Sequence, residues 1–94
     1  MEATKVLYVE DEVFLAKIVK EGLESRGYQV RLLAEGGSVV QTFAAWQPDI
    51  CIFDVMLPQK DGFEVAELIR QQNRPPPIFF NFSSIFPSSL QRQA

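Results

Sequence analysis

The sequence predicts an α/β domain in which helices cover both faces of a parallel β-sheet. Short apolar runs of strand length alternate along the chain with amphipathic stretches of helical length. Connections of that length join parallel strands, and they pack back onto the sheet with right-handed geometry. With 94 residues, the chain has room for one such domain.

The first half of the chain predicts two strands and two helices. Residues 5–9 predict a strand, because residues 6–9 form a continuous apolar run, typical of a strand buried on both faces. Residues 13–26 repeat apolar side chains at four-residue spacing, which predicts a helix, and Gly27 suits its C-terminal cap. Residues 28–33 alternate in polarity like an edge strand, and residues 38–46 predict a second helix.

The second half predicts a buried strand, a helix and a short final strand. Residues 50–53 are apolar and include the single cysteine, Cys51. Asp61 is placed to cap a helix that runs from about Gly62 to about Gln72. The side chains that this helix is expected to bury are Val65, Leu68 and Ile69. After a proline-rich link, residues 78–80 predict the last strand.

Composition excludes several classes of function. The net charge is -3 and there is no histidine, which argues against a nucleic-acid surface and against imidazole chemistry. The N-terminus lacks the apolar core of a signal peptide, and no apolar stretch approaches about 18 residues. One free cysteine suits a reducing compartment. We therefore expect a cytoplasmic domain without membrane contact.

Carboxylates follow two of the predicted strands. Asp54 ends the apolar run of residues 50–53, and an acidic cluster at residues 10–12 ends the apolar run of residues 6–9. In doubly wound sheets, ligands bind beyond the carboxyl ends of the strands, where the strand order reverses. If these two strands are neighbours, their acids meet there and suit a hard cation such as Mg²⁺.

Two motifs at this edge carry a family resemblance. The first is Val-Leu-Tyr-Val-Glu-Asp-Glu at residues 6–12, and the second is Asp-Val-Met-Leu-Pro at residues 54–58, followed by Asp-Gly-Phe at residues 61–63. Together they resemble the receiver domain of two-component response regulators, in particular the winged-helix transcription-factor class, over about residues 4–81. The resemblance implies a flavodoxin-like, doubly wound sheet in the order 2-1-3-4.

The resemblance also implies roles for individual residues. Asp54 matches the phosphoacceptor, which takes a phosphoryl group from a phosphohistidine on a sensor histidine kinase. The Mg²⁺ ligands would be Asp11, Asp54 and the backbone carbonyl of Met56, with Glu10 reaching the ion through water. Pro58 and Gly62 match residues that shape the loop beside the site. The implied function is phosphorelay signalling, in which the chain is an acceptor and not an enzyme.

Two parts of the family pattern are missing. The position of the hydroxyl that contacts the phosphoryl group falls on Phe82, and Ser83 and Ser84 are weak substitutes. No lysine follows Lys60, so the phosphate-contacting lysine has no match. We therefore expect an incomplete, C-terminally truncated receiver over residues 1–81, lacking the usual dimer face. The divergent tail would be residues 82–94.

Two other functions stay open. A pseudo-receiver would act only as a binding module or vestigial fragment, and the missing hydroxyl and lysine favour it. A phosphatase of the haloacid-dehalogenase type also uses an aspartate nucleophile. It requires a second acid two residues later, where this chain has Met56.

Overall fold

A computed structural model of the chain describes residues 2–57 and 60–81. Strands and helices alternate in the predicted order. The elements are β1 (Lys5–Val9), α1 (Val13–Ser25), β2 (Gln29–Leu33), α2 (Val39–Trp46), β3 (Ile50–Asp54), α3 (Gly62–Arg70) and β4 (Ile78–Asn81).

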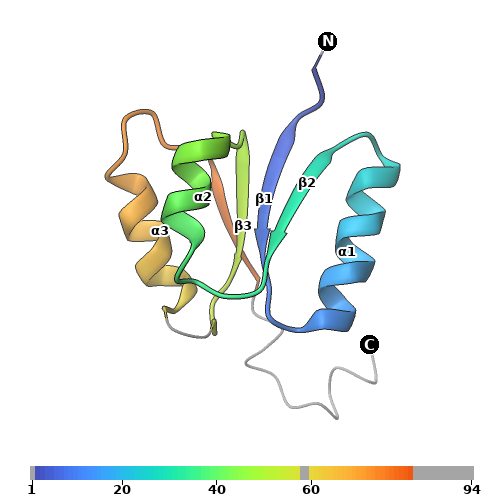
Figure 1. Cartoon of the computed structure of the whole chain (residues 1–94), viewed down its shortest axis with the longest axis horizontal. Coiled ribbons are helices and arrows are strands. Elements are labelled where there is room, and N and C mark those ends of the chain that lie inside the picture. Colours follow the sequence, from blue (N-terminus) through green and yellow to red (C-terminus); the bar gives the residue numbers. More distant parts are fainter. Residues whose placement is uncertain (1, 58–59, 82–94) are drawn as a thin grey trace.

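The strands form one parallel sheet in the order β2-β1-β3-β4, which confirms the predicted fold (Figure 1). The strand order reverses between β1 and β3. Val9 is in register with Phe53, and Asp54 is in register with Asn81. The carboxyl ends of β1, β3 and β4 therefore lie at one edge of the sheet.

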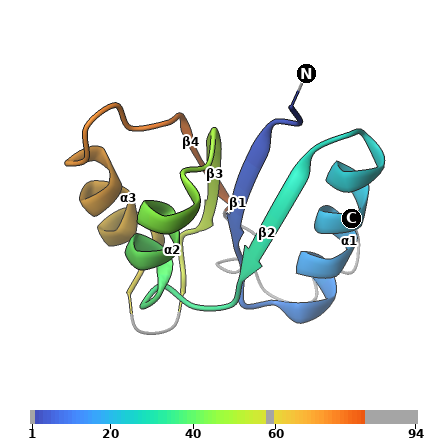
Figure 2. The ribbon, with the colours of Figure 1, turned by 45° about the horizontal axis from the view of Figure 1, so that its top comes forward.

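Helices lie on both sides of the sheet, with α2 and α3 on one side and α1 on the other (Figures 1 and 2). The main core lies beneath α2 and α3. Its buried members are Leu7, Val9, Val39, Cys51, Phe53, Val65, Ala66 and Ile69. Burial raises the pKa of the Cys51 thiol to about 12, so this cysteine is a core residue and not a reactive thiolate.

The other face is less completely covered than the apolar pattern of α1 suggests. In α1 only Ala16 is fully buried, whereas Phe14 is 77% exposed and Ile18 is 55% exposed. Neighbouring residues lie about 100° apart around a helix of 3.6 residues per turn. Leu15 and Val19 are half-buried, so their neighbours Phe14 and Ile18 lie toward one side of the helix, where they are exposed.

Two predicted helix caps are present. Gly27 has φ +94°, the left-handed conformation that suits a residue following a helix. Asp61 caps α3, because its Oδ1 accepts a hydrogen bond of 2.8 Å from the backbone N–H of Glu64. The helix ends at Arg70, two residues before the predicted end, and β4 extends one residue further than predicted, to Asn81.

The single tryptophan lies at the end of the sheet opposite the acids. The Lys5 ammonium lies 5.6 Å from the centroid of the Trp46 ring, and the Arg31 guanidinium lies 4.8 Å from it. These cation–π contacts join α2 to the start of β1 and to β2. Trp46 is half-buried, so its fluorescence can report unfolding without contact with the acidic site.

Within residues 2–57 and 60–81, none of the helices has the length and apolar character needed to cross a bilayer.

Candidate functional site

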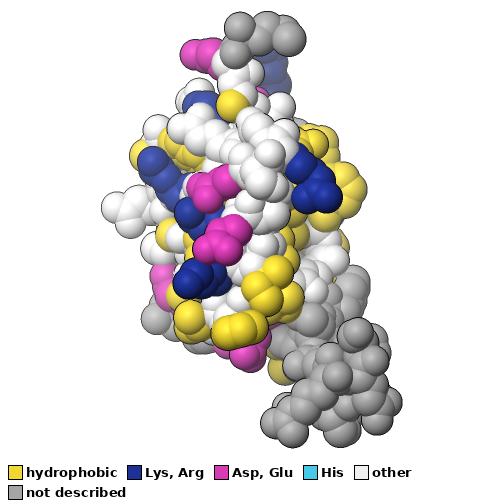
Figure 3. Space-filling view, turned by 90° about the vertical axis from the view of Figure 1, so that its right-hand side faces the viewer, with side chains coloured by type: hydrophobic (Ala, Val, Ile, Leu, Met, Phe, Trp, Pro, Cys, Tyr) yellow, Lys and Arg dark blue, Asp and Glu magenta, His cyan; other side chains and the backbone are white. Residues whose placement is uncertain are grey.

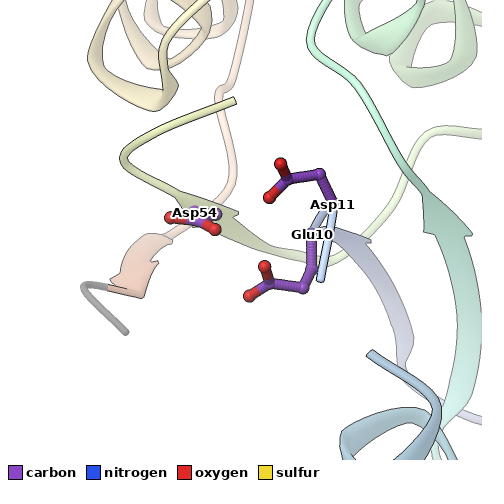
Figure 4. A group of neighbouring side chains, drawn as sticks. All are labelled: Glu10, Asp11 and Asp54. Atoms are coloured by element: carbon purple, nitrogen blue, oxygen red, sulfur yellow. The ribbon is translucent and has the colours of Figure 1, made fainter. Parts of the chain in front are cut away.

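Three acids meet at the carboxyl edge of the sheet (Figure 4). Glu10 and Asp11 directly follow β1, and Asp54 is the last residue of β3. One carboxylate oxygen from each residue lies within 4.8 Å of those from the other two. The structure thus brings together the three acids that the sequence placed at neighbouring strand ends.

The three acids differ in burial. Glu10 is 1% exposed and Asp54 is fully buried, whereas Asp11 faces solvent. Burial raises the pKa of Glu10 to about 8, and its hydrogen bond with Asp54 contributes in the same direction. Glu10 therefore holds a proton at neutral pH in the absence of a cation, and that proton reduces the repulsion between the two buried carboxylates.

Backbone amides orient both buried acids. The N–H of Met56 donates to Oδ1 of Asp54 over 3.1 Å, and the N–H of Glu12 donates to Oε2 of Glu10 over 3.1 Å. In each case the donor lies two residues after the acid, the spacing of an Asx-type turn. The turn that ends each strand therefore also directs its carboxylate.

Asn81 is a site residue that the sequence analysis missed. Its Nδ2 donates to Oε1 of Glu10 over 2.7 Å, and its backbone carbonyl accepts from the N–H of Val55 over 3.0 Å. The prediction ended the last strand at Phe80, so Asn81 was not considered. The available signal was a polar residue at the end of a parallel strand, the same signal that identified Asp54.

Tyr8 lies beneath the acids, with its side chain 1% exposed. Burial raises the pKa of Tyr8, the charge of Glu10 adds to the rise, and Asn81 opposes it. The hydroxyl therefore stays protonated and adds no further negative charge to the site.

Two glycines allow close backbone approaches, one of them at Asp54. A Cβ at Gly62 would lie 2.2 Å from the carbonyl oxygen of Asp54, so no side chain fits there. Gly36, in the loop between β2 and α2, lies against the backbone of Lys60, and a Cβ there would lie 2.5 Å from the Lys60 carbonyl oxygen. The sequence analysis singled out Gly62 but gave Gly36 no role.

Several predicted site residues stay predictions. The N–H of Met56 is at the site, but its carbonyl as a metal ligand is untested, and its side chain is 56% exposed. Pro58 and the weak hydroxyl candidates Ser83 and Ser84 lie outside the described residues.

The residues present fit a divalent cation. Three carboxylates supply only oxygen donors, which suits a hard ion such as Mg²⁺. Asp11 is exposed, so the group is open to solvent on one side, as a site that admits both an ion and a phosphoryl group requires. The arrangement can hold a cation and present the Asp54 carboxylate beside it.

Comparison with known proteins agrees with this geometry. The family model of the response regulator receiver domain matches residues 6–84. The transcriptional regulatory protein RprY of Bacteroides fragilis is 37% identical over 79 residues, which cover 84% of this chain and 34% of RprY. The alkaline phosphatase synthesis transcriptional regulatory protein PhoP of Bacillus subtilis is 36% identical over 74 residues, which cover 79% of this chain and 31% of PhoP.

Solved structures show the same fold. The chemotaxis response regulator CheY4 of Vibrio cholerae superposes with a TM-score of 0.81 at 28% identity, over 95% of this chain and 76% of that one. A receiver domain of a signal transduction histidine kinase from Syntrophus aciditrophicus gives 0.80 at 28% identity, over 97% and 70%.

The fold, the acidic site and these matches place the chain in the family of response regulator receiver domains of two-component systems. The chain spans about a third of the length of the curated relatives that it matches.

Proposed function

We propose that this chain is a phosphoacceptor in a two-component phosphorelay, with Asp54 as the residue that is phosphorylated. The observation that carries the proposal is the position of Asp54. It is buried at the end of β3, its Oδ1 is held by the N–H of Met56, and Glu10 and Asp11 lie beside it. A carboxylate fixed next to a cation site is the arrangement that phosphoryl transfer to an acid requires.

In the proposed reaction, a carboxylate oxygen of Asp54 attacks the phosphorus of a phosphohistidine on a sensor histidine kinase. The new P–O bond gives an aspartyl phosphate, the P–N bond breaks, and the imidazole leaves with the electron pair. Asp11, Asp54 and the Met56 carbonyl would hold Mg²⁺, with Glu10 acting through water. When bound, the ion offsets the negative charge that develops on the phosphoryl oxygens. The chain is the acceptor in this reaction and not an enzyme with a separate substrate.

Labelling with a small phosphodonor tests the proposal. The intact chain is incubated with phosphoramidate, with and without Mg²⁺, and its mass is measured. We expect a Mg²⁺-dependent gain of one phosphoryl group, absent in Asp54→Asn. Asp49→Asn is a matched control, because Asp49 is exposed and directly precedes β3, at the end of the strand opposite Asp54.

A folded chain that gains no phosphoryl group under these conditions would contradict the proposal. That result would favour a pseudo-receiver that binds a partner without being phosphorylated. Circular dichroism and Trp46 fluorescence establish that the sample is folded.

A further inference from the structure

Asn81 connects two strands that are not neighbours in the sheet. It is the last residue of β4, in register with Asp54 of β3. Its side chain reaches Glu10 at the end of β1, and the Nδ2–Oε1 distance is 2.7 Å. In the order β2-β1-β3-β4, this hydrogen bond spans the end of β3, where Asp54 lies.

Glu10 is consequently held at both carboxylate oxygens. Asn81 donates to Oε1, and the N–H of Glu12 donates to Oε2. A glutamate side chain has several rotatable bonds, and fixing them in one conformation has an entropic cost. Two donors on opposite oxygens offset that cost and direct the carboxylate toward Asp54, as Figure 4 shows for Glu10 and Asp54.

We propose that Asn81 is a positioning residue for the cation site, acting through Glu10. This inference rests on the proposed function, because it assigns Asn81 to the same site. An amide is suited to the task, since it donates a hydrogen bond without adding a positive charge that would repel Mg²⁺. Each carboxylate oxygen has two lone pairs, so Oε1 can accept from Asn81 and still face water or an ion.

The test measures Mg²⁺ affinity of the whole chain by isothermal titration calorimetry. Asn81→Leu removes the donor while keeping the same number and branching of side-chain heavy atoms. Partners that orient a ligand typically contribute 10–100-fold to metal affinity. We expect the dissociation constant to rise by roughly tenfold or more. Asn81→Val is a second variant with high strand propensity, for use if leucine prevents folding. Urea unfolding followed by Trp46 fluorescence confirms that each variant is folded.

A double-mutant cycle separates positioning from a purely structural role. If Asn81 acts through Glu10, Asn81→Leu should have little further effect on Mg²⁺ affinity in a Glu10→Ala background. The control is Gln72→Leu. Gln72 lies in the turn after α3, and its exposed side chain donates a hydrogen bond to the backbone carbonyl of Leu68 in α3. It should leave affinity unchanged.

The possible outcomes are distinguishable. Two results would overturn the role of Asn81 without affecting the proposed function. One is unchanged Mg²⁺ affinity in folded Asn81→Leu or Asn81→Val. The other is an effect of Asn81→Leu on Mg²⁺ affinity that is as large in the Glu10→Ala background as in the unmodified chain. Mg²⁺ binding without phosphorylation of Asp54 would overturn the proposed function alone. Absence of Mg²⁺ binding by the unmodified chain would overturn both.

Discussion

The ionisation of Glu10 makes the free energy of unfolding depend on pH. Burial and the hydrogen bond with Asp54 raise its pKa from 4.5 to about 8. Between those values the folded chain keeps a proton that the unfolded chain has lost. Because the unfolded state then binds fewer protons, the free energy of unfolding must fall as pH rises through this window.

The predicted fall in the free energy of unfolding with rising pH can be checked with metal-free protein. Urea unfolding from about pH 5 to about pH 8 should show the free energy of unfolding falling with a slope of up to about 1.4 kcal/mol per pH unit from this group. Glu10→Gln should flatten the slope, because the amide resembles the protonated acid and does not titrate. Glu21→Gln, which changes an exposed acid on α1, should keep the slope. A slope that is equal in Glu10→Gln and the unmodified chain would refute this role of Glu10.

Residue types at strand ends explain which site residues could be predicted. Asp54 directly follows an apolar run, and Asp11 belongs to the acidic cluster that follows another. The sequence pattern alone therefore predicted that they lie close together. That Glu10 is the acid whose pKa is raised could not be read from the sequence, because it depends on burial and on the contact with Asp54. Asn81 was missed because strand length, unlike strand existence, is weakly encoded in a short apolar run.

In the turn from β3 into α3, the packing of Gly62 affects the position of Asp54. Gly62 is the buried first residue of α3, and its N–H donates to the carbonyl of Val55 over 2.8 Å. A Cβ would meet the Asp54 carbonyl oxygen at 2.2 Å, and this obstacle is backbone. A side chain at this position must therefore displace the end of the strand that carries Asp54.

We expect Gly62→Ala to lower the free energy of unfolding by about 1–3 kcal/mol, as overpacking typically does, and to weaken Mg²⁺ binding. The matched control is Gly22→Ala in α1, where the nearest atom to a new Cβ is a flexible arginine nitrogen at 3.9 Å. Alanine is favoured over glycine within a helix by about 0.5–1 kcal/mol, so this variant should be more stable. Urea unfolding and calorimetry measure both effects. Equal stability changes in the two variants would contradict the close approach at Gly62.

Element order and helix caps were predictable because they depend on local sequence. Asp61 and Gly27 act through hydrogen bonds and dihedral angles within a few residues of each helix end. The exposure of Phe14 and Ile18 was not predictable, because both lie in a regular apolar repeat. Whether such a side chain is buried depends on which elements lie opposite α1.

Several large apolar side chains are accessible on the side of the molecule where α1 lies. Phe80 packs on the core beneath α2 and α3. Because successive side chains of a strand point to opposite faces, Phe79 faces the side of α1, where it is 58% exposed. Phe14 and Ile18 of α1 are exposed as well. Figure 3, viewed from the side of α1, shows hydrophobic side chains among charges of both signs. Exposed apolar side chains on this side, with Phe79 on the edge strand β4, favour self-association.

Replacing two of these side chains should reduce self-association without a large loss of stability. Phe79→Thr keeps strand propensity, and Ile18→Gln keeps helix propensity. Sedimentation velocity over a range of concentrations should show less association in the double variant, while its urea midpoint changes little. Thr42→Ser, a mild change on α2, is a control that should not alter association. Undiminished association in the double variant would contradict a role for this face.

The claim that Asp54 accepts the phosphoryl group can be tested by chemical trapping at this residue. After incubation with phosphoramidate and Mg²⁺, borohydride reduces an aspartyl phosphate to homoserine, and peptide mass spectrometry locates the change. The predicted result is homoserine at position 54 and at no other aspartate, only when Mg²⁺ is present. Homoserine at another aspartate, or its absence from a folded and Mg²⁺-bound chain, would contradict the claim.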